Sequence, residues 1–589
     1  MSILIDAVRI NGFRGLSNLE IHLPRVCVLL GTNNSGKTSI IKALQLALGD
    51  YSRYLTEEDF HIDKDDNVAE AIIVDVRIIA IGEDDERAKK FDDEWIDEFG
   101  ELIQSEPKGT QFLIIRTRCE RDKVKGGFIT SRYWLESWPD SDGWANVKII
   151  PNRQIRKRFD AIPFISIDAQ RDIHQELREK NSYISRALSS IQYDEKDVEE
   201  LERLVSDINE KAVAKSESLL ELKNHLDSLS QSFEGSGQTE ITPFPKKIRD
   251  LSKRFTVHFG DQESNSFSME YHGMGTRSWA SMLTVKAFIE NYAKKHKEEE
   301  EPFFPIIAAE EPEAHLHPNA QRTLYQQLSA SKGQVIVSTH SPFLAAMVNL
   351  PDLRSLVKLN GTVIVKQLSN NFNIENLQAL QREVMRFRGE LLFSNAIILV
   401  EGVTEEQFVP AMFEHYFGFS AFSKGVNCIS VAGQNYAPFI KMACSFGVPI
   451  CVVSDNDNGT KKNVDSQISN IKEKPGLELN SDEFQIYFLK EGNDIEAELV
   501  RELGITEELI EALALLKTKG SGNQQHLEAI KKDLDSNEDA LLKTLRCKKA
   551  SYAGFLADVI CRNPLKRNKG DLVPNAFKSA FNQIENWIS

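Results

Sequence analysis

The chain has 589 residues, of which 41% are hydrophobic and 27% are charged, and its formal net charge is −17. One hydrophobic core does not extend over such a length, so about three or four domains are expected. The composition is that of a globular protein, and no apolar run approaches the roughly 18 residues that cross a bilayer. The negative charge excludes a surface with general, sequence-independent affinity for DNA. It still allows a local basic groove or a metal-mediated phosphate contact.

The seven cysteines are scattered and form no CxxC pair, which favours free thiols in a reducing cytosol. The first stretch, MSILIDAVRI, carries Asp6 inside its apolar run and has no basic segment before it. It therefore does not resemble a signal peptide. We expect a cytoplasmic protein that makes no membrane contact.

Residues 26–48 predict a strand, a loop and a helix in that order. The loop, GTNNSGKT, fits the pattern G-x-x-x-x-G-K-[ST], follows an apolar strand at 26–30 and opens a helix at 38–48. Glycines let backbone N–H groups close around phosphates, Lys37 reaches the β- and γ-phosphate oxygens, and the Thr38 hydroxyl ligates Mg²⁺. The predicted ATP-binding residues are Gly31, Asn33, Asn34, Ser35, Gly36, Lys37, Thr38 and Ser39.

Two more apolar strands, each ending in polar residues, are expected between 303 and 350, in PIIAAEEPEAHLHP and VIVSTHSP. Glu310, at the end of the first strand, would hold the Mg²⁺ and its water shell, and Glu311 would orient the attacking water. His340 follows the second strand and would sense the γ-phosphate, although this residue taken alone is equally a loop histidine without a ligand. The three elements in this order favour a nucleotide site.

From about 174 to 233 the pattern changes to long helices. Val198, Leu201, Val205 and Ile208 are spaced by 3, 4 and 3 residues, as in a helical seam. A second run with this spacing consists of Leu219, Leu222, Leu226 and Leu229. A hairpin that packs on itself and a dimerisation surface both fit this pattern.

After residue 390 strands and helices alternate again, with strands at 396–400, 427–431 and 449–454 and helices at 405–416 and 437–446. This succession is typical of a parallel sheet. The first strand, in AIILVEGVTEEQF, and the last, in PICVVSDND, both end in acidic residues, and EGNDIEAELV adds two more. These acids are Glu401, Glu405, Asp455, Asp457, Asp494 and Glu496.

Acids at the ends of parallel strands meet at the carboxyl edge of the sheet. Asp455 and Asp457 would face the same side of an extended strand, and Glu405 lies one helical turn after Glu401. Without partners these carboxylates would repel one another, and Mg²⁺ or Mn²⁺ would neutralise them. Two such ions about 4 Å apart activate water and stabilise the leaving oxygen in phosphodiester cleavage. Each acid alone reads as a helix cap or a solvated residue, but the E-G-x-x-E and D-x-D patterns together favour a metal site.

The segments INGFRGL, GTNNSGKTS, YHGMGTRSWASML, EEPEAHLHP and STHSP resemble the ABC-type ATPase head of RecF/SMC-like proteins. In that family two heads enclose nucleotide, and each lends a glycine-rich signature to the other. The resemblance implies that Gly273 and Gly275 belong to this signature, although the sequence is not LSGGQ. It also makes Gln170, in SIDAQRD, the Q-loop residue. Asn34 and Glu310 depart from the Gly and Asp of many relatives.

The second half resembles the Toprim fold of topoisomerases, primases and certain nucleases. A RecF/SMC-like head followed by Toprim is similar to the OLD (overcoming lysogenisation defect) endonuclease family, which includes the nuclease of the Gabija antiphage system and nucleases encoded beside some retrons. The resemblance implies that the six acids above are metal ligands. CKKASYA resembles the family's K-x-x-[FY]-A element, so Lys549, with Lys548 as its competitor, would stabilise charge on the phosphate. Gly433, in VAGQNY, would be structural.

The predicted fold class is α/β. An ABC-type P-loop ATPase head occupies residues 1–173 and 256–385, and a helical segment for dimerisation is inserted at 174–255. A Toprim parallel-sheet domain with a helical C-terminal part follows at 390–589.

The predicted function is that of an ATP-binding, nucleotide-regulated DNA endonuclease that uses Mg²⁺ or Mn²⁺, with two ions in the Toprim site, as the effector of an antiphage defence system. The family implies a homodimer or tetramer. It also implies that the chain works alone, with a helicase, or with a retron reverse transcriptase and its RNA–DNA hybrid. The alternative is a non-nucleolytic RecF/SMC-like DNA repair ATPase whose Toprim domain only binds. A topoisomerase or primase would need a strand-passing tyrosine domain or a zinc ribbon, which the sequence does not supply, and a transporter ATPase would leave the second half unexplained.

Overall fold

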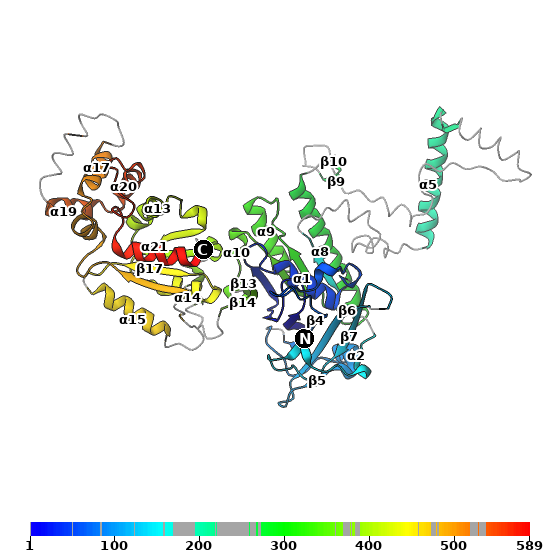
Figure 1. The fold of residues 1–589 in the computed structure, drawn as a ribbon. Coiled ribbons are helices and arrows are strands. Elements are labelled where there is room, and N and C mark those ends of the chain that lie inside the picture. Colours follow the sequence, from blue (N-terminus) through cyan, green and yellow to red (C-terminus); the bar gives the residue numbers. More distant parts are fainter. Residues whose placement is uncertain are drawn as a thin grey trace, which may run out of the picture.

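The computed structural model describes residues 2–588 except 50, 83–84, 123, 157–158, 169–194, 218, 221–257, 260–266, 269–272, 360, 369–376, 379, 383–388, 458, 473–478, 480–481, 519–527 and 529–537. The described strands form two six-stranded sheets, one four-stranded sheet and a two-stranded sheet of β9 (His258–Phe259) and β10 (Phe267–Ser268) (Figure 1). None of the described helices combines the length and the hydrophobicity that a bilayer crossing needs.

The first six-stranded sheet is antiparallel and is built from the N-terminal segment. Its path is β2 (Leu19–His22), β1 (Ser2–Asn11), β4 (Ala71–Ile81), β6 (Gln111–Arg121) and β5 (Gln104–Ser105), and β7 (Phe128–Trp134) pairs with β6. α2 (Asp93–Phe99) lies in the chain between β4 and β5.

The second six-stranded sheet carries the P-loop. Its order is β14 (Thr362–Lys366), β13 (Leu353–Leu359), β3 (Val26–Leu30), β12 (Gln334–Ser338), β11 (Ile306–Glu310) and β8 (Phe164–Ile167). All neighbours are parallel except β13 and β14. Strands that are far apart in sequence therefore place their carboxyl ends along one edge.

Both faces of this sheet are buried, which explains why its strands are continuous apolar runs. Cys27 and Leu29 of β3 belong to the core shared with the antiparallel sheet and α1 (Lys37–Leu48). Val28 and Leu30 belong to the core on the opposite face, as the alternation of side chains along a strand requires. The helices on that face are α8 (Met274–Glu298), α9 (Pro318–Ser329) and α10 (Pro342–Ala345).

The four-stranded sheet is parallel throughout, with the order β16 (Val426–Ser430), β15 (Ala396–Val400), β17 (Ile450–Ser454) and β18 (Phe484–Phe488). The expected strand–helix alternation is confirmed, with each end within about two residues of its predicted place. β18 was not predicted. The helices of this half are α13 (Val403–Phe417), α14 (Ala437–Phe446), α15 (Thr460–Lys472), α16 (Ile495–Ala497), a π-helix (Glu498–Glu502), α17 (Thr506–Lys517), α19 (Glu538–Lys548), α20 (Ala550–Arg562) and α21 (Asn575–Ile588).

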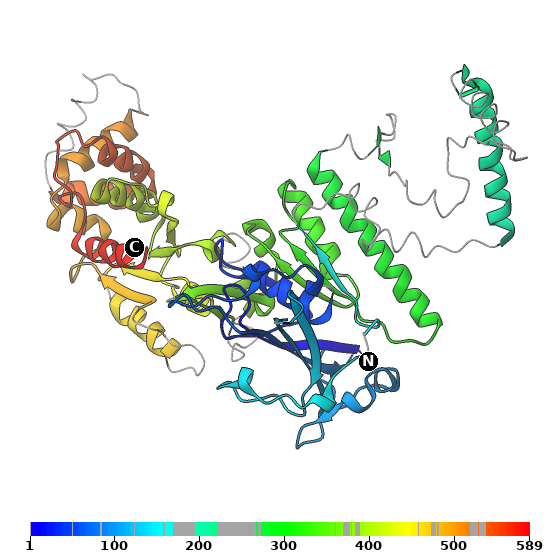
Figure 2. The same ribbon diagram turned by 45° about the vertical axis from the view of Figure 1, so that its right-hand side comes forward.

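The inserted helical segment is described in part, as α5 (Glu195–Lys215). Figures 1 and 2 both show α5 standing apart from the three large sheets. The first predicted seam lies on this helix, where Leu201 and Ile208 are exposed and Val198 and Val205 are half-buried. Three leucines of the second seam lie outside the described residues, namely Leu222, Leu226 and Leu229.

The two halves share one core where α10 meets the short 3₁₀ helix η10 (Gly389–Phe393) just before β15. Leu344 of α10, Leu391 of η10 and Ile397 of β15 belong to the same buried cluster. A Cβ on Gly389 would lie 2.7 Å from the Pro342 carbonyl oxygen, so the backbones approach too closely for a side chain. The head and the four-stranded sheet therefore pack as one continuous interior at this point.

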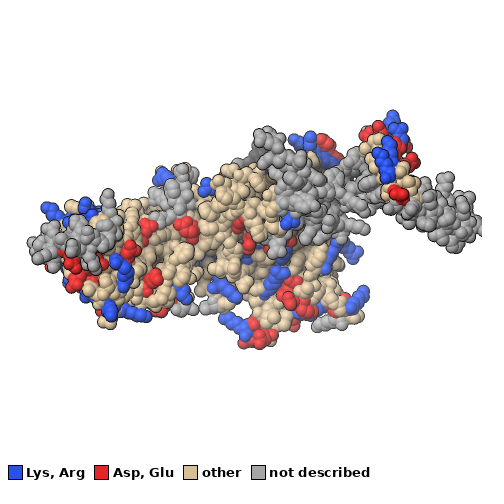
Figure 3. Space-filling view, turned by 90° about the horizontal axis from the view of Figure 1, so that it is seen from above, with Lys and Arg blue, Asp and Glu red and all other residues tan. Residues whose placement is uncertain are grey.

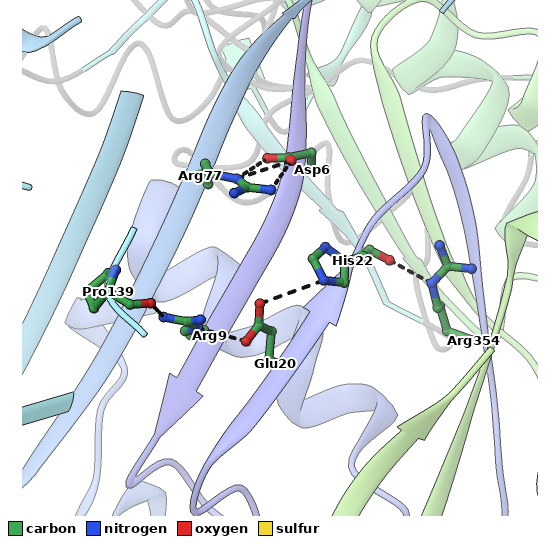
Figure 4. A network of polar contacts seen from close by, with 7 residues as sticks. All are labelled: Asp6, Arg9, Glu20, His22, Arg77, Pro139 and Arg354. Atoms are coloured by element: carbon green, nitrogen blue, oxygen red, sulfur yellow. Dashed lines mark hydrogen bonds and ion pairs between the residues drawn. The ribbon is translucent and has the colours of Figure 1, made fainter. Parts of the chain in front are cut away.

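Polar contacts join the edges of the two head sheets (Figure 4). Arg9 of β1 donates its Nε–H to Glu20 of β2 at 2.9 Å. Arg354 of β13, in the P-loop sheet, donates its Nε–H to the His22 carbonyl oxygen at 2.6 Å. A side chain of one sheet thus satisfies a backbone carbonyl at the edge of the other.

A fully buried ion pair lies inside the antiparallel sheet. Arg116 of β6 sits directly opposite Asp75 of β4, and both side chains are 0% exposed. Nε and Nη2 of Arg116 donate to the two carboxylate oxygens at 2.7 and 2.6 Å, and further donors reach the Trp144 and Val147 carbonyls. This satisfies the guanidinium without water, as burial of a charge requires.

We expect Asp75→Ala to destabilise the protein by about 3–5 kcal/mol, because it leaves the buried Arg116 charge uncompensated. Denaturant unfolding would measure the loss. Glu120→Ala, which removes an exposed partner of Arg118, is the matched control and should cost about 1 kcal/mol or less. The double variant Asp75→Leu/Arg116→Met should recover much of the lost stability, and a double variant as unstable as Asp75→Ala would contradict this account.

Candidate functional site

The P-loop lies between β3 and α1, as the sequence predicts. Gly31 and Gly36 have φ values of 148° and 99°, and Asn34 has φ 63°. A Cβ on Gly31 would lie 2.7 Å from the Leu356 carbonyl oxygen, so glycine is required there for space as well as for conformation. Asn34 tolerates the left-handed conformation better than most residues, which accounts for asparagine at a position that is glycine in many relatives.

The side chain of Lys37 folds back over this loop. Its ammonium donates to the carbonyls of Gly31 and Thr32 at 2.9 and 3.0 Å, and the residue is buried. Burial lowers the pKa of Lys37, while the negative charge of Glu311 acts to raise it. A phosphate bound in the loop would offer this ammonium the same kind of oxygen partner that the two carbonyls now provide. Asn33 and Thr38 are exposed and Ser35 is buried.

The strand-end residues of the head meet the P-loop from the neighbouring strands. Glu310 ends β11 opposite Ser338 of β12, and the Glu311 N–H donates to the Ser338 carbonyl at 2.9 Å. His340 Nε2 lies 3.6 Å from Glu311 Oε1. Burial, followed by the charge of Lys37, lowers the pKa of His340, so its imidazole is neutral at pH 7 and free to donate one N–H to a phosphate oxygen.

Glu313, which was not singled out from the sequence, positions the loop that carries His340. Its carboxylate accepts from the Thr339 hydroxyl at 2.5 Å and from the His340 N–H at 3.0 Å. The residue is 8% exposed. In the sequence Glu313 is visible only as the third acid of EEPEAHLHP. Its positioning role depends on contacts with the residues that follow β12, which the sequence pattern does not reveal.

Two further residues of the nucleotide site were missed. Lys42 of α1 places its ammonium 3.0 Å from Asp168 and 3.2 Å from Glu310. Asp168 directly follows β8, whose last residue, Ile167, pairs with Ala309 of β11. The two acids therefore end adjacent strands, and Lys42 neutralises both. The sequence signal for Asp168 was an acid directly after an apolar strand. The predicted Q-loop residue, Gln170, lies outside the described residues.

The predicted signature glycines lie at the start of α8. Gly273 precedes the helix, and no atom lies within 4 Å of a Cβ placed on it. A Cβ on Gly275 would lie 2.5 Å from the His315 carbonyl oxygen, in the loop after β11. Gly275 therefore allows close packing within its own chain. Its role toward a second head stays a prediction.

The acids of the second cluster gather at the carboxyl edge of the four-stranded sheet. Glu401 directly follows β15 and Asp455 directly follows β17, which are adjacent parallel strands. The Glu401 carbonyl accepts the N–H of Gly433, whose φ of 138° suits glycine. Glu405 lies in the first turn of α13, is 5% exposed, and accepts the Gly402 N–H at 3.3 Å. Glu405 is thus a helix cap and a member of the cluster at once.

The negative charges of these acids act on one another. Burial, followed by the charges of Glu405 and Glu401, raises the pKa of Asp455 to about 9. Burial, and among the neighbouring charges first that of Glu496, raises the pKa of Glu405 to about 7. Burial also raises the pKa of Glu401 and Glu496, and in both the charge of Lys549 opposes the shift. The largest influences on Asp455 are all unfavourable to its charged form.

This donor set fits divalent cations. Carboxylate oxygens are the ligands that Mg²⁺ and Mn²⁺ prefer, and Glu401 Oε2 is buried without a hydrogen-bond partner in the described chain. In the absence of ions, no three ligand atoms of these acids lie within 4.8 Å of one another, whereas those of His296, Glu299 and Glu301 do. That second group lies at the C-terminal end of α8, where His296 Nδ1 is 3.0 Å from Glu301 Oε2.

Asp457 and Asp494 have partners of their own. Asp457 accepts the Thr460 hydroxyl at 2.9 Å. Asp494 caps α16 by accepting the Ala497 N–H at 2.9 Å, and both of its oxygens accept from Arg546, at 2.7 and 2.9 Å. Asp494 thus pairs with Arg546, and its role as a metal ligand stays a prediction.

Lys549 is the single residue between α19 and α20. Its φ of 33° is unusual for a residue with a side chain, and such strain is common at functional positions. Its charge acts on Glu401 and Glu496, as described above. Lys548 ends α19, and Lys548 and Lys549 are both exposed. Of the two lysines, Lys549 is the one whose charge is placed against the acidic cluster.

Known proteins resemble both halves of the chain. Residues 3–385 match the family described as "Protein of unknown function (DUF2813)", and residues 392–457 match "Overcoming lysogenization defect protein-like, TOPRIM domain". The second match contains the acids that follow β15 and β17 and ends before those of α16.

Named relatives align with most of the chain. The Old nuclease of Escherichia phage P2 is 24% identical over 459 residues, which cover 74% of this chain and 74% of that protein. The endonuclease GajA of Bacillus cereus (strain HuB5-5) is 23% identical over 541 residues, with coverages of 79% and 76%. Among solved structures, the SMC head domain from Thermotoga maritima is 13% identical and covers 62% of this chain and 99% of that one, with a TM-score of 0.29. The chain therefore belongs to the DUF2813 family, and the segment that follows its head resembles the Toprim domain of overcoming lysogenisation defect (OLD) proteins.

Proposed function

We propose that the protein is a divalent-metal-dependent DNA endonuclease whose ATP-binding head regulates cleavage in the Toprim domain. The observation that carries this proposal is the buried acidic cluster at the sheet edge, with Lys549 placed against it. Glu401, Glu405 and Asp455 come from two adjacent strand ends, and burial raises the pKa of each. Because ionisation of these buried carboxyl groups is unfavourable, the cluster is suited to bind cations that stabilise the ionised form.

Each side chain of the cluster has a role in this proposal. Two bound ions would supply an activated water and stabilise the leaving oxygen of the phosphodiester. Glu401, Glu405, Asp455, Asp457 and Glu496 would hold the ions. The ammonium of Lys549 would lie beside the phosphate oxygens on which negative charge develops.

The substrate proposed is DNA, since relatives of this chain are named nuclease or endonuclease. Figure 3 shows Lys and Arg side chains interspersed with Asp and Glu on the face in view, without a single basic surface. With a net charge of −17, the chain would bind DNA through local contacts and through metal ions. Contact with the acidic cluster itself would therefore depend on divalent cations.

Regulation by nucleotide is supported by packing between the two sites. Ser341, next to the phosphate-sensing His340, caps α10 by accepting the Leu344 N–H at 3.2 Å. α10 packs against η10, and η10 leads into β15, which ends at Glu401. A change at the γ-phosphate position is thereby linked to the first metal ligand through one short helix and one strand.

The biological setting is proposed from the family. The Old nuclease and the endonuclease GajA are similar to this chain over 74% and 79% of its length, which supports a nuclease, and the antiphage role is proposed from the resemblance to the OLD family. A homodimer or tetramer remains a prediction that rests on the α5 seam and the family, as do a helicase or a retron reverse transcriptase with its RNA–DNA hybrid as partners. A non-nucleolytic DNA repair ATPase stays the alternative, and ATP turnover without DNA cleavage under every metal and partner condition would favour it.

We expect Asp455→Asn to lower DNA cleavage about 100-fold or more, since it removes a buried ligand of the metal site. The assay follows conversion of supercoiled plasmid to nicked and linear forms with Mg²⁺ or Mn²⁺. Asp465→Asn, an exposed acid on α15, is the control and should leave cleavage unchanged. Undiminished cleavage by Asp455→Asn would contradict the Toprim assignment.

Without divalent ions, the stability of the protein should depend on the proton carried by Asp455. Its pKa is about 9 in the folded chain and about 3.9 in an unfolded one. The folded state therefore binds more protons between these values, and its stability falls as the pH rises through this range.

Asp455→Asn removes this dependence. In EDTA the variant should gain more in Tm relative to the wild type at about pH 8.5 than at about pH 5. Differential scanning calorimetry would measure both values, with Asp465→Asn as the control. Added Mg²⁺ should stabilise the wild type and have little effect on Asp455→Asn, and a Tm difference that is independent of pH would contradict the raised pKa of Asp455.

For the head, Lys37→Ala should abolish ATP binding, because it removes the ammonium that closes the P-loop. Glu311→Gln should bind ATP normally but release γ-phosphate about 100-fold more slowly, since an amide does not accept a proton from the attacking water. Calorimetric titration and a phosphate-release assay would measure the two effects. Equal phosphate release by the wild type and Glu311→Gln would show that the head senses ATP without Glu311-assisted hydrolysis.

A further inference from the structure

Arg546 is the one residue of the Toprim site that carries a fork of hydrogen bonds within the described chain. Its Nε and Nη2 donate to the two oxygens of Asp494 at 2.7 and 2.9 Å. Asp494 is in turn fixed by the N–H of Ala497, at the start of α16. The carboxylate is thus held by the backbone on one side and orients a guanidinium on the other.

The pairing with Asp494 uses only some of the N–H donors of Arg546. A guanidinium has five N–H donors, and the two hydrogen bonds to Asp494 use two of them. The Arg546 side chain is 48% exposed, whereas that of Asp494 is 18% exposed. The remaining donors are therefore available to an anion without loss of the pair.

Arg546 also stands on the border of the acidic cluster. The charges of Asp494, Glu496 and Asp457 all act on it, and the pair with Asp494 raises the pKa of the guanidinium. It precedes Lys549 by three residues in the chain, and the charge of Lys549 acts on Glu401 and Glu496 of the same cluster. Two cations, one forked and one point-like, are therefore placed beside the same group of carboxylates.

The geometry points to Arg546 as a residue that binds a phosphate of the DNA strand next to the scissile bond, with Asp494 as its positioning residue. Guanidinium donors match phosphate oxygens in pairs, and an arginine fixed by a carboxylate loses little entropy on binding. This inference rests on the proposed nuclease function. It assigns the substrate contact that the acidic cluster itself is unable to make without ions.

The test measures DNA binding rather than cleavage. In the cleavage-deficient Asp455→Asn background, the affinity for a short DNA duplex is measured at about 50 and about 200 mM salt, because each lost phosphate contact lowers the salt dependence by about 0.9 in the logarithmic slope. With Arg546→Gln the ratio of Kd values between the two salt concentrations should fall about threefold. Arg546→Lys should retain the slope and bind more weakly, since it keeps the charge and loses the fork.

Arg562→Gln is the matched control. Arg562 ends α20, is 54% exposed and pairs with Glu511, and it lies about 18 Å along the helix from Lys549. Its substitution should leave the slope and the affinity unchanged. An Arg546→Gln slope equal to that of the control would overturn the inference, whereas a wild type that neither binds nor cleaves DNA would overturn the proposed function.

Asp494 has its own readout. Asp494→Asn should raise the Kd for DNA with the salt slope retained, because the guanidinium is still present but less well oriented. An unchanged Kd would overturn the positioning role of Asp494.

Discussion

Unbalanced negative charge in a buried place is the constraint on which the Toprim half depends. Asp455 and Glu405 lie among other carboxylates, and their pKa values of about 9 and about 7 record the free energy needed to ionise them there. A buried charge without a partner costs several kcal/mol. The folded chain therefore carries protons or cations at this edge, and adjacent parallel strands with a common direction are what bring the acids there.

In the head, lysine side chains balance the negative charge of the acidic residues. Lys42 lies between Asp168 and Glu310, and Lys37 lies over the loop next to Glu311. A site that receives a triphosphate gains from lysines already in place, because the ligand is the anion. A site that receives a phosphodiester through metal ions gains from acids. The chain thus has two candidate phosphate sites of opposite charge, the lysines of the head and the acids of the four-stranded sheet. The two halves share one core.

Much of this arrangement follows from local sequence. The apolar runs at 26–30 and 396–400 are strands with those bounds, because buried parallel strands need no polar alternation. The P-loop and the strand-end acids follow from glycine chemistry and from the polarity of a sheet edge. The predicted α/β class and the resemblance to OLD proteins are confirmed.

The missed residues depend on contacts between distant segments. From the sequence alone, Lys42 has the pattern of a solvated helix residue. Its role depends on the pairing of β8 with β11, which places Asp168 beside Glu310. The pair of Asp494 with Arg546 was not predicted, because Arg546 lies 52 residues later in the sequence. Spacing predicts which acids share a strand end. It does not predict which basic side chain folds back onto them.

Only one residue, Lys549, links α19 and α20. The direction of its side chain therefore depends on the number of residues in α19. An extra residue in α19 would rotate the helix end that carries this lysine by about 100° and advance it by about 1.5 Å. The lysine would then point to another part of the surface although its identity is intact. Insertions and deletions within these two helices should therefore be more damaging than most substitutions of their exposed residues.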